Sequence, residues 1–186
     1  MREPSFGRNS MKRKSRPLNA EKLGEIALAY VARYATSSAK LAAYLQRKLR
    51  ERGWDGEVEP DVQGLVGRYL ELGYIDDESY ARTRSDGLLR RGYGKRRIDV
   101  ALQAAGIDSD IREEIAPEET ALRQAALAMA RKRRFGPFGA ESPDRDRREK
   151  QIAAMLRAGH GFDDARTLVR APSEVAAEQW AASGEE

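Results

Sequence analysis

Apolar residues recur along almost the whole chain at intervals of three and four positions, the spacing that places them on one face of an α-helix. The first such run is Leu23, Ile26, Ala27, Tyr30, Val31 and Tyr34. Eight further runs cover residues 41–49, 62–70, 76–88, 98–105, 111–115, 122–129, 143–156 and 162–169. No stretch shows the alternation of a half-buried strand. The pattern therefore predicts an all-α fold of about nine helices.

Three of the predicted helix ends resemble one another. Each has a glycine, a bulky apolar residue and an aspartate in succession: Gly53-Trp54-Asp55, Gly106-Ile107-Asp108 and Gly161-Phe162-Asp163, with the glycines 53 and 55 residues apart. Glycine suits the residue after a helix, the apolar residue packs back on that helix, and aspartate caps the next one. A three-helix unit of this size cannot bury its apolar faces alone, so the repeat predicts an elongated tandem array of three three-helix repeats.

These signals divide the chain into five segments. We expect a flexible basic extension at 1–17, helical repeats at 18–74, 75–116 and 117–172, and an acidic tail at 173–186 that is also flexible. The first 20 residues contain six cations and one acid, whereas the last thirteen contain four acids and no cation. Segments dominated by like charges have too little apolar surface to fold by themselves.

The composition is that of a charged, water-soluble chain. Charged residues make up 34%, the net charge is +4, and the mean hydropathy is −0.72. No apolar run approaches the roughly 20 residues that span a bilayer, and the basic N-terminus lacks the apolar middle of a signal peptide. Cysteine is absent, which favours the reducing cytoplasm as the location.

Groups that support catalysis or metal binding are scarce. The only histidine, His160, lies between two glycines in a predicted flexible turn. The chain has no cysteine and no glycine-rich phosphate-binding loop. The acids Asp76, Asp77 and Glu78 begin a predicted helix, where acids stabilise the positive end of the helix dipole more often than they bind Mg²⁺. We therefore expect no metal, no cofactor and no enzymatic activity.

Basic residues gather at three places. The first surrounds Gly92-Tyr93-Gly94 and comprises Arg90, Arg91, Lys95, Arg96 and Arg97. The second lies on one predicted helix and comprises Lys40, Arg47, Lys48, Arg50 and Arg52. The third comprises Arg131, Lys132, Arg133 and Arg134. We take the first and third groups, with Tyr93, Lys48 and Arg52, as candidate contacts to an anionic partner.

The first group is the strongest of the three signals. Its cations end one predicted helix and begin the next, so they converge on one exposed corner. Cations at a helix N-terminus oppose the positive dipole end and the free N–H groups, which makes an anionic partner the natural explanation. Tyr93 either stacks on a nucleic-acid base or packs across the turn.

The segment GYIDDESYA at 73–81, followed by LLRRGYGKRRIDVALQAAGI, resembles the RecX family of bacterial recombination regulators. The resemblance is strong over residues 60–108, fair over 20–60 and weaker beyond 117. It implies a curved array of three three-helix repeats that binds in the groove of the RecA filament on single-stranded DNA. It also implies inhibition or modulation of strand exchange, ATP hydrolysis and the repressor cleavage of the SOS response.

The resemblance makes the RecA filament the expected partner, with DNA itself a second candidate, and we expect a monomer. The alternative is a stand-alone helical DNA-binding protein. Because the helix after the basic turn offers only Asp99 and Gln103 to base edges, that alternative would lack sequence specificity.

Overall fold

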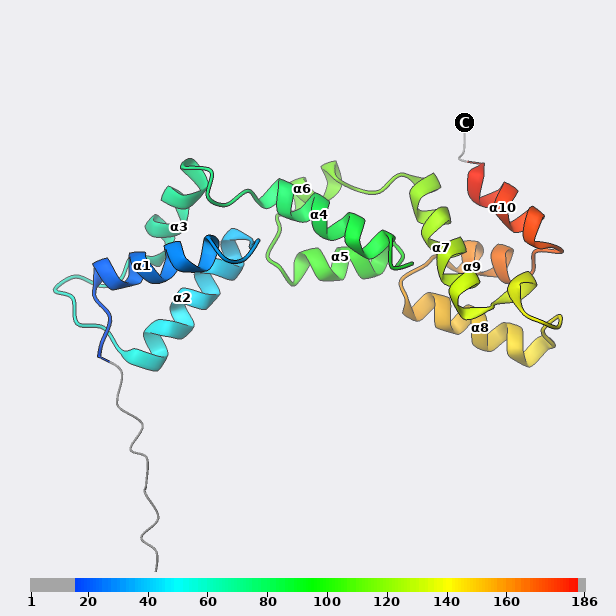
Figure 1. The fold of residues 1–186 in the computed structure, drawn as a ribbon, viewed down its shortest axis with the longest axis horizontal. Helices are drawn as coiled ribbons and strands as arrows, with labels where there is room; N and C mark the ends of the chain where they lie inside the picture. Colours follow the sequence, from blue (N-terminus) through cyan, green and yellow to red (C-terminus); the bar gives the residue numbers. More distant parts are fainter. Residues whose placement is uncertain (1–15, 184–186) are drawn as a thin grey trace, which may run out of the picture.

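The computed structural model describes residues 16–183 and shows an elongated, all-helical array (Figure 1). Within these residues there are ten α-helices and one 3₁₀ helix, and the only β-type pairing is an isolated bridge between Leu18 and Trp54. The predicted all-α class is confirmed. The count differs from the expected nine because the C-terminal segment forms a tenth helix.

The helices succeed one another with short connections. Their bounds are α1 Ala20–Val31, α2 Ser38–Arg52, α3 Val62–Glu71, α4 Asp77–Leu89, α5 Lys95–Gln103, α6 Ser109–Glu114, α7 Glu119–Arg133, η1 Gly136–Phe138, α8 Arg145–Arg157, α9 Phe162–Val169 and α10 Glu174–Ala182. Seven of them begin with a side-chain oxygen that accepts a hydrogen bond from the first turn. The capping residues are Asn19, Ser37, Asp61, Asp76, Asp108, Asp144 and Ser173.

Each set of three helices surrounds its own apolar cluster, and we refer to these sets as units. The first unit, α1–α3, buries Leu41 and Leu45, and the second, α4–α6, buries Ile98 and Leu102. The third, α7–α9, buries Met155 and Leu168 among several alanines and is joined by η1 and α10. The division into repeats at the expected boundaries stays a prediction. Most of the expected N-terminal extension, residues 1–15, lies outside the described residues.

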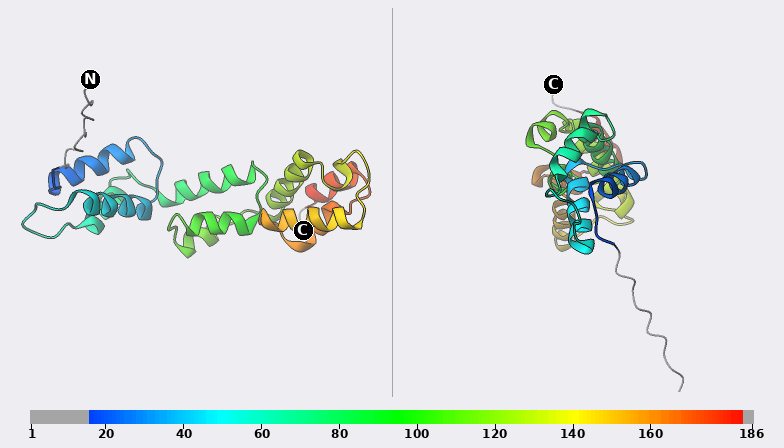
Figure 2. Two further views of the ribbon diagram at one scale, coloured as in Figure 1. Left: turned by 90° about the horizontal axis from the view of Figure 1, so that it is seen from below. Right: turned by 90° about the vertical axis from the view of Figure 1, so that its left-hand side faces the viewer.

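The second helices of the three units lie end to end and form what we call the spine (Figure 2). The C-terminal turn of α8 meets the N-terminus of α5, and the C-terminal turn of α5 meets the N-terminus of α2. The partial negative charge at one helix end therefore faces the partial positive charge at the next. The hydrogen bonds at each meeting point satisfy backbone groups that a helix end would otherwise leave to water.

The meeting of α8 with α5, which we call the distal joint, is made mostly of backbone. The amides of Gly94 and Arg96 donate to the carbonyls of Ala158 and Gly159, at 3.0 and 3.2 Å. A Cβ atom on Gly94 would lie 2.4 Å from the carbonyl carbon of Gly159, and one on Gly159 would lie 2.4 Å from the amide nitrogen of Arg97. Only glycine permits the two backbones to approach this closely.

The meeting of α5 with α2, the proximal joint, uses side chains as well. The Ser37 hydroxyl donates to the carbonyl of Ala105 at 2.5 Å. The Ser38 amide and hydroxyl donate to the two carboxylate oxygens of Asp77, at 2.8 and 2.5 Å. Asp77 therefore links the first unit to the second, in addition to lying in the first turn of α4 as the sequence indicates.

The third glycine of the repeat is Gly159 rather than the expected Gly161. The amides of Ile107 and His160 each bond to the carbonyl five residues earlier, at 3.1 and 3.2 Å, so Gly106 and Gly159 occupy equivalent positions. This assignment makes the glycine spacing 53 residues at both steps. Gly161 instead precedes α9 as its N-cap, and the Phe162 side chain is exposed rather than packed back.

The expected flexible acidic tail is wrong for residues 173–182, because they form α10 and pack on the third unit. Ala177 and Ala181 are fully buried, and Glu178 forms an ion pair with Arg131 of α7. The Gln124 side chain donates to the carbonyl of Ala181 at 2.9 Å. The acidic side chains of α10 lie on one side and leave a face of alanines that packs closely against α7. A count of charges does not reveal this face. Residues 184–186 lie outside the described residues.

The histidine is also placed differently from the expectation of a flexible turn. Only 7% of His160 is exposed, and its Nε2 lies 3.0 Å from the carbonyl oxygen of Gly92 across the distal joint. Burial lowers the pKa of His160 below its usual 6.5, since the imidazolium loses water, while the Gly92 hydrogen bond and the Asp164 charge act in the opposite direction.

We expect the stability of the distal joint to depend on pH. Because the folded-state pKa of His160 is below 6.5, its contribution is complete above pH 6.5 and is lost as the pH falls through the folded-state pKa. Urea unfolding at pH 7.5 and pH 5.0 should show a larger loss of unfolding free energy for the wild type than for His160→Gln. Equal losses in the two proteins would show that His160 does not titrate in this way.

Candidate functional site

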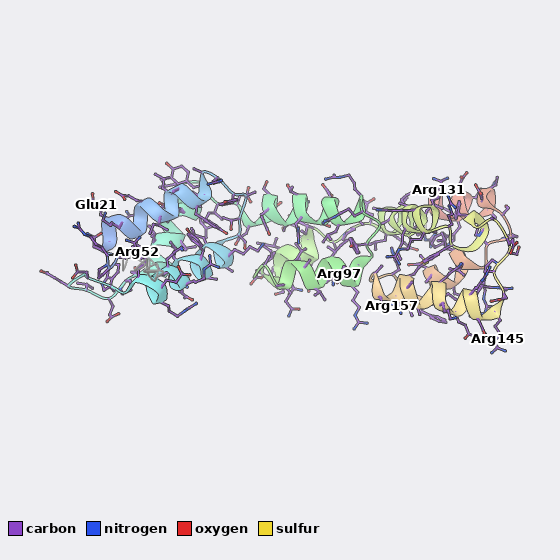
Figure 3. All side chains as sticks on the ribbon, turned by 60° about the horizontal axis from the view of Figure 1, so that its bottom comes forward. Glu21, Arg52, Arg97, Arg131, Arg145 and Arg157 are labelled. Carbon is purple, nitrogen blue, oxygen red and sulfur yellow. The ribbon has the colours of Figure 1, made fainter. Side chains whose placement is uncertain are left out.

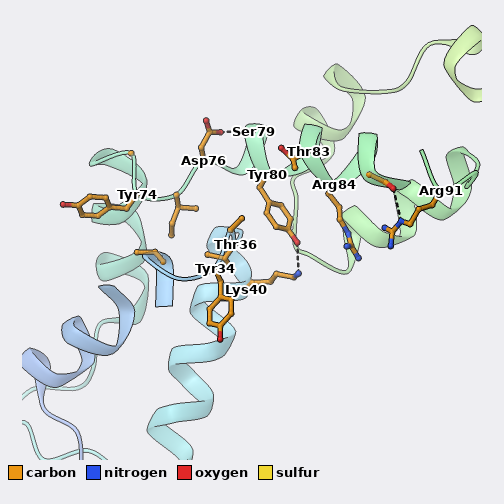
Figure 4. A pocket seen from close by; sticks show the side chains of 15 residues that line it. Tyr34, Thr36, Lys40, Tyr74, Asp76, Ser79, Tyr80, Thr83, Arg84 and Arg91 are labelled. Atoms are coloured by element: carbon orange, nitrogen blue, oxygen red, sulfur yellow. Dashed lines mark hydrogen bonds between the residues drawn. The ribbon is translucent and has the colours of Figure 1, made fainter. Parts of the chain in front are cut away.

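One face of α4 carries a stripe of cationic and aromatic residues. Tyr80, Arg84 and Gly87 lie four and three positions apart, and Arg91, just beyond the helix, continues the same face. Figure 4 shows Tyr80 reaching Lys40 of the first unit, with Arg84 and Arg91 farther along the same side of α4. Two units therefore contribute to one surface.

This surface is hollowed between the two units. A cleft of about 560 Å³ runs along α4 and is closed on the other side by the loop after α1, which includes Tyr34. A second hollow of about 360 Å³ continues from it toward α5 and shares Lys40, Arg84 and Arg91 with the first. We call the combined feature the cationic groove and define it by Lys40, Tyr80, Arg84, Arg91, Tyr93 and Arg97.

Aromatic rings hold three of the four groove cations in place. The Lys40 ammonium donates to the Tyr80 hydroxyl at 2.7 Å and lies 5.2 Å from the centre of that ring. The guanidinium carbons of Arg91 and Arg97 lie 5.8 and 5.9 Å from the centre of the Tyr93 ring. The hydrogen bond of Lys40 and the cation–π contacts of the two arginines restrain these long side chains before any partner arrives.

The groove cations lack acidic partners within the described chain. All four are exposed, and none forms an ion pair with a carboxylate among residues 16–183. Among the described residues, Arg91 bonds only to the carbonyl of Gly87, at 2.9 Å. The groove therefore presents uncompensated positive charge that an anionic partner can neutralise.

The structure separates the residues of the predicted basic turn. Arg91, Tyr93 and Arg97 line the groove, whereas Arg96 lines a neighbouring hollow together with Arg157. Arg90 and Lys95 are exposed and lie outside the lining of the groove. The turn is not a free corner, since Gly92 and Gly94 are buried against the third unit. Tyr93 packs across the turn, in contact with two of the apolar clusters.

The N-terminus of α5 also differs from the expected one, at which unpaired amides favour an anionic partner. The N-terminus of α5 does not leave its amides free, because Gly94 and Arg96 donate to the carbonyls that end α8. The negative partial charge of those carbonyls offsets the positive end of the α5 dipole beside the basic residues. Positive charge without internal carboxylate partners, rather than an unfavourable dipole, is what favours an anionic partner here.

Apart from Lys40, which lines the groove, the other two basic groups lie away from it. Figure 3 shows Arg52 in the first unit and Arg131 in the third, away from Arg97. Arg52 donates to the carbonyl of Arg16 at 2.8 Å, and Arg131 is paired with Glu178. Lys48 is half-buried and forms an ion pair with Glu51 at 2.8 Å, which lowers the pKa of that carboxyl group.

The remaining cations of the third group, Lys132, Arg133 and Arg134, are exposed at the end of α7. Their role in binding a partner stays a prediction, as does that of Lys48, Arg52 and Arg131. Arg84 lies outside the three dense basic groups of the sequence, and Tyr80 is counted there among the apolar positions of its helix. Neither is therefore predicted as a site residue. The helical spacing of positions 80, 84, 87 and 91 is the signal that brings them together.

Neither metal binding nor membrane crossing finds support in the described residues. Among residues 16–183 no three His, Cys, Asp or Glu side chains are grouped so that they could hold a metal ion. No helix in this part of the chain has both the length and the apolarity needed to cross a membrane. The lining of the groove itself includes cations, phenols and hydroxyl groups. These groups are suited to binding an anion through hydrogen bonds and charge.

Comparison with known proteins gives a consistent result. A family model described as "RecX, second three-helix domain" matches residues 76–115, which contain α4–α6. The regulatory protein RecX of Myxococcus xanthus is 29% identical over 166 residues, covering 84% of this chain and 89% of the relative. That of Thermus thermophilus is 32% identical over 164 residues, covering 88% of this chain and 96% of the relative.

A solved structure shows the same fold. The crystal structure of RecX from Lactobacillus salivarius superimposes with a TM-score of 0.63 at 20% sequence identity, covering 80% of this chain and 92% of that one. The Thermus relative exceeds 30% identity and is matched over nearly its whole length. The family model matches the second unit, which contributes Tyr80, Arg84, Arg91, Tyr93 and Arg97 to the groove. The chain therefore belongs to the RecX family of regulatory proteins.

Proposed function

We propose that this protein regulates recombination and DNA repair by binding the RecA filament on single-stranded DNA. Bound there, it inhibits or modulates strand exchange, ATP hydrolysis and the coprotease activity of RecA. The observation that carries the proposal is the cationic groove, a two-unit surface whose cations have no carboxylate partner among residues 16–183. Membership of a family named as regulatory proteins supports it.

A binding role fits the chemistry of the groove better than a catalytic one. Its lining contains no histidine. The only histidine of the chain is bonded to the carbonyl of Gly92 in the distal joint. We therefore propose a non-enzymatic regulator that acts in the cytoplasm as a monomer. The elongated array suits a filament, since it can contact more than one subunit along the groove of the partner.

The proposal is tested by removing charge from the groove. The variant Arg84→Gln, Arg91→Gln, Arg97→Gln should bind RecA filaments on single-stranded DNA at least about 100-fold more weakly, since each charge-assisted hydrogen bond contributes about 1.5–3 kcal/mol. Co-sedimentation with filaments across a salt series measures the affinity. The salt dependence should become shallower, because fewer counterions are exchanged on binding.

A matched control keeps the change in net charge the same. Arg145→Gln, Arg166→Gln, Arg170→Gln removes three exposed cations of the third unit that lie outside the groove. This variant should retain most of the affinity and should still alter the ATPase activity of RecA. Equal losses in the two triple variants would indicate a general charge effect. Full retention of binding by the groove variant would remove the groove from the interface.

A further inference from the structure

The two ends of the larger cleft differ in chemistry. Near the first unit it is lined by Val31, Tyr34 and Tyr74. The two tyrosines are exposed over 50% and 55% of their surface, although both are large and largely apolar. Toward the second unit the lining becomes cationic, with Arg84 and Arg91. A single partner segment that fills the cleft must therefore bring an apolar group to one end and negative charge to the other.

The Tyr93 ring at the cationic end does not offer a free face to a nucleic-acid base. It has two guanidinium groups within 6 Å of its centre, and the Tyr80 hydroxyl is already bonded to the Lys40 ammonium. Base stacking on Tyr93 would displace the cations that the phosphates need. Asp76 also lines the apolar end, with its carboxylate accepting from the Ser79 amide, and its negative charge disfavours a continuous phosphate backbone there.

A peptide segment fits these constraints. Ser79 and Thr83 line the cleft between its two ends, and their hydroxyl groups can bond to the backbone of an extended chain. The distance along the helix from Tyr80 to Arg91 is about 16 Å at 1.5 Å per residue. Because an extended chain advances about 3.3 Å per residue, this span accommodates about five residues.

The geometry points to an acidic peptide segment as the ligand of the cationic groove, with one bulky apolar side chain ahead of its carboxylates. The apolar side chain packs against Tyr34 and Tyr74, and the carboxylates pair with Arg84 and Arg91. The inference deepens the proposed function, on which it rests for taking the groove as the contact surface. It assigns these cations to acidic protein surface on the partner rather than to DNA phosphate.

The test uses short labelled probes and the full chain without RecA. Fluorescence anisotropy compares fluorescein-labelled Phe-Gly-Glu-Glu-Glu with Ser-Gly-Glu-Glu-Glu and with a 15-nucleotide oligothymidylate. We expect saturable binding of the phenylalanine peptide and about tenfold weaker binding of the serine peptide, since an aromatic side chain loses its buried contact. The oligothymidylate should show no binding that depends on the groove residues.

Variants separate the two ends of the cleft. Arg84→Gln, Arg91→Gln should weaken the phenylalanine peptide by at least about tenfold. Tyr34→Ala should weaken the phenylalanine peptide but leave the serine peptide unchanged. Leu28→Ala is the control, because Leu28 is a similarly exposed apolar residue of the first unit outside the cleft lining. Loss in the Leu28 variant equal to that in the Tyr34 variant would contradict the assignment.

The outcomes also distinguish this inference from the proposed function. If the peptides fail to bind while RecA filaments bind through the groove, the acidic-peptide assignment is wrong and the proposed function stands. If the phenylalanine peptide binds as expected but filaments do not, the acidic-peptide assignment stands and the proposed function is wrong. If oligothymidylate binds and the Arg84, Arg91 variant loses it, the groove takes nucleic acid and the inference is overturned.

Discussion

Replacing Gly94 by alanine should disrupt the distal joint while leaving the second and third units folded. The backbone of Gly94 is accessible to alanine, at φ −87°, so the substitution introduces no local strain. Its Cβ, however, would lie 2.4–2.5 Å from backbone atoms of Gly159 and His160. Backbone cannot move aside like the end of a flexible side chain, so we expect the joint to open, at a cost of about 1–3 kcal/mol.

The measurement exploits the absence of cysteine from the chain. Cysteines introduced at the exposed positions Gln103 of α5 and Arg166 of α9 allow two spin labels to report the distance between units. The distance distribution should shift and broaden in Gly94→Ala, while the helix content measured by circular dichroism stays nearly the same. Binding to RecA filaments should weaken although no contact residue has changed, because the units no longer engage the filament together.

A second glycine provides the control for backbone strain. Gly53 has φ +81° but no atom within 4 Å of an added Cβ. Gly53→Ala should therefore lower the unfolding free energy modestly, by about 1 kcal/mol, through strain alone. It should not change the label distance across the distal joint. An unaltered distribution in Gly94→Ala would show that the close approach of the two backbones does not fix the arrangement of the units.

Removal of residues 173–186 should destabilise the third unit strongly. The deletion uncovers the surface of α7 on which Ala177 and Ala181 are fully buried. It also removes the cation–π contact between Arg123 and Trp180 at 5.4 Å. We expect a loss on the order of 3 kcal/mol in the free energy of unfolding, the scale for losing a large packed side chain. Urea unfolding of the full and shortened chains measures it.

Point variants keep this prediction testable if the shortened chain fails to fold. Trp180→Ala should cost about 3 kcal/mol or somewhat less, since Trp180 is only half-buried. Val175→Ala in the same helix should cost less than about 0.5 kcal/mol, because Val175 is 60% exposed. Similar values for the two variants would mean that α10 does not hold the third unit together.

The helices could be predicted from the sequence because their signal is local. The three-and-four spacing of apolar residues depends only on the geometry of a single helix. The exception is α10, whose buried face is made of alanines, and alanine faces resemble exposed ones in hydropathy. The sequence pattern also places the helix-ending glycine of the third unit two residues too late, because Gly159 and Gly161 flank His160. By hydropathy, Phe162 is a better candidate than a histidine for the residue that packs back on the helix.

The joints and the groove were harder to predict because they depend on distant segments. The distal joint is made by carbonyls of residues 158 and 159 with amides of residues 94 and 96, and backbone groups leave no sequence signal beyond the glycines. The groove brings Lys40 beside Tyr80, forty positions along the chain. Arg91 and Arg97 of the groove could be predicted from charge density, and Tyr93 from its place between them. Arg84 required knowledge of which face of α4 points toward the first unit.

The bridge between Leu18 and Trp54 closes the spine at the C-terminal end of α2. At the two joints the helix end is met by the amides or the hydroxyl group of the following helix in the spine. At the end of α2 the carbonyl of Gly53 is instead taken by the amide of Leu18, at 2.9 Å, and Leu18 in turn accepts from Asp55 at 2.8 Å. The row of stacked helices is thus terminated from within the chain. A longer protein of this design would gain reach by inserting units between joints, while growth at the Leu18 end would require this closure to be dismantled first.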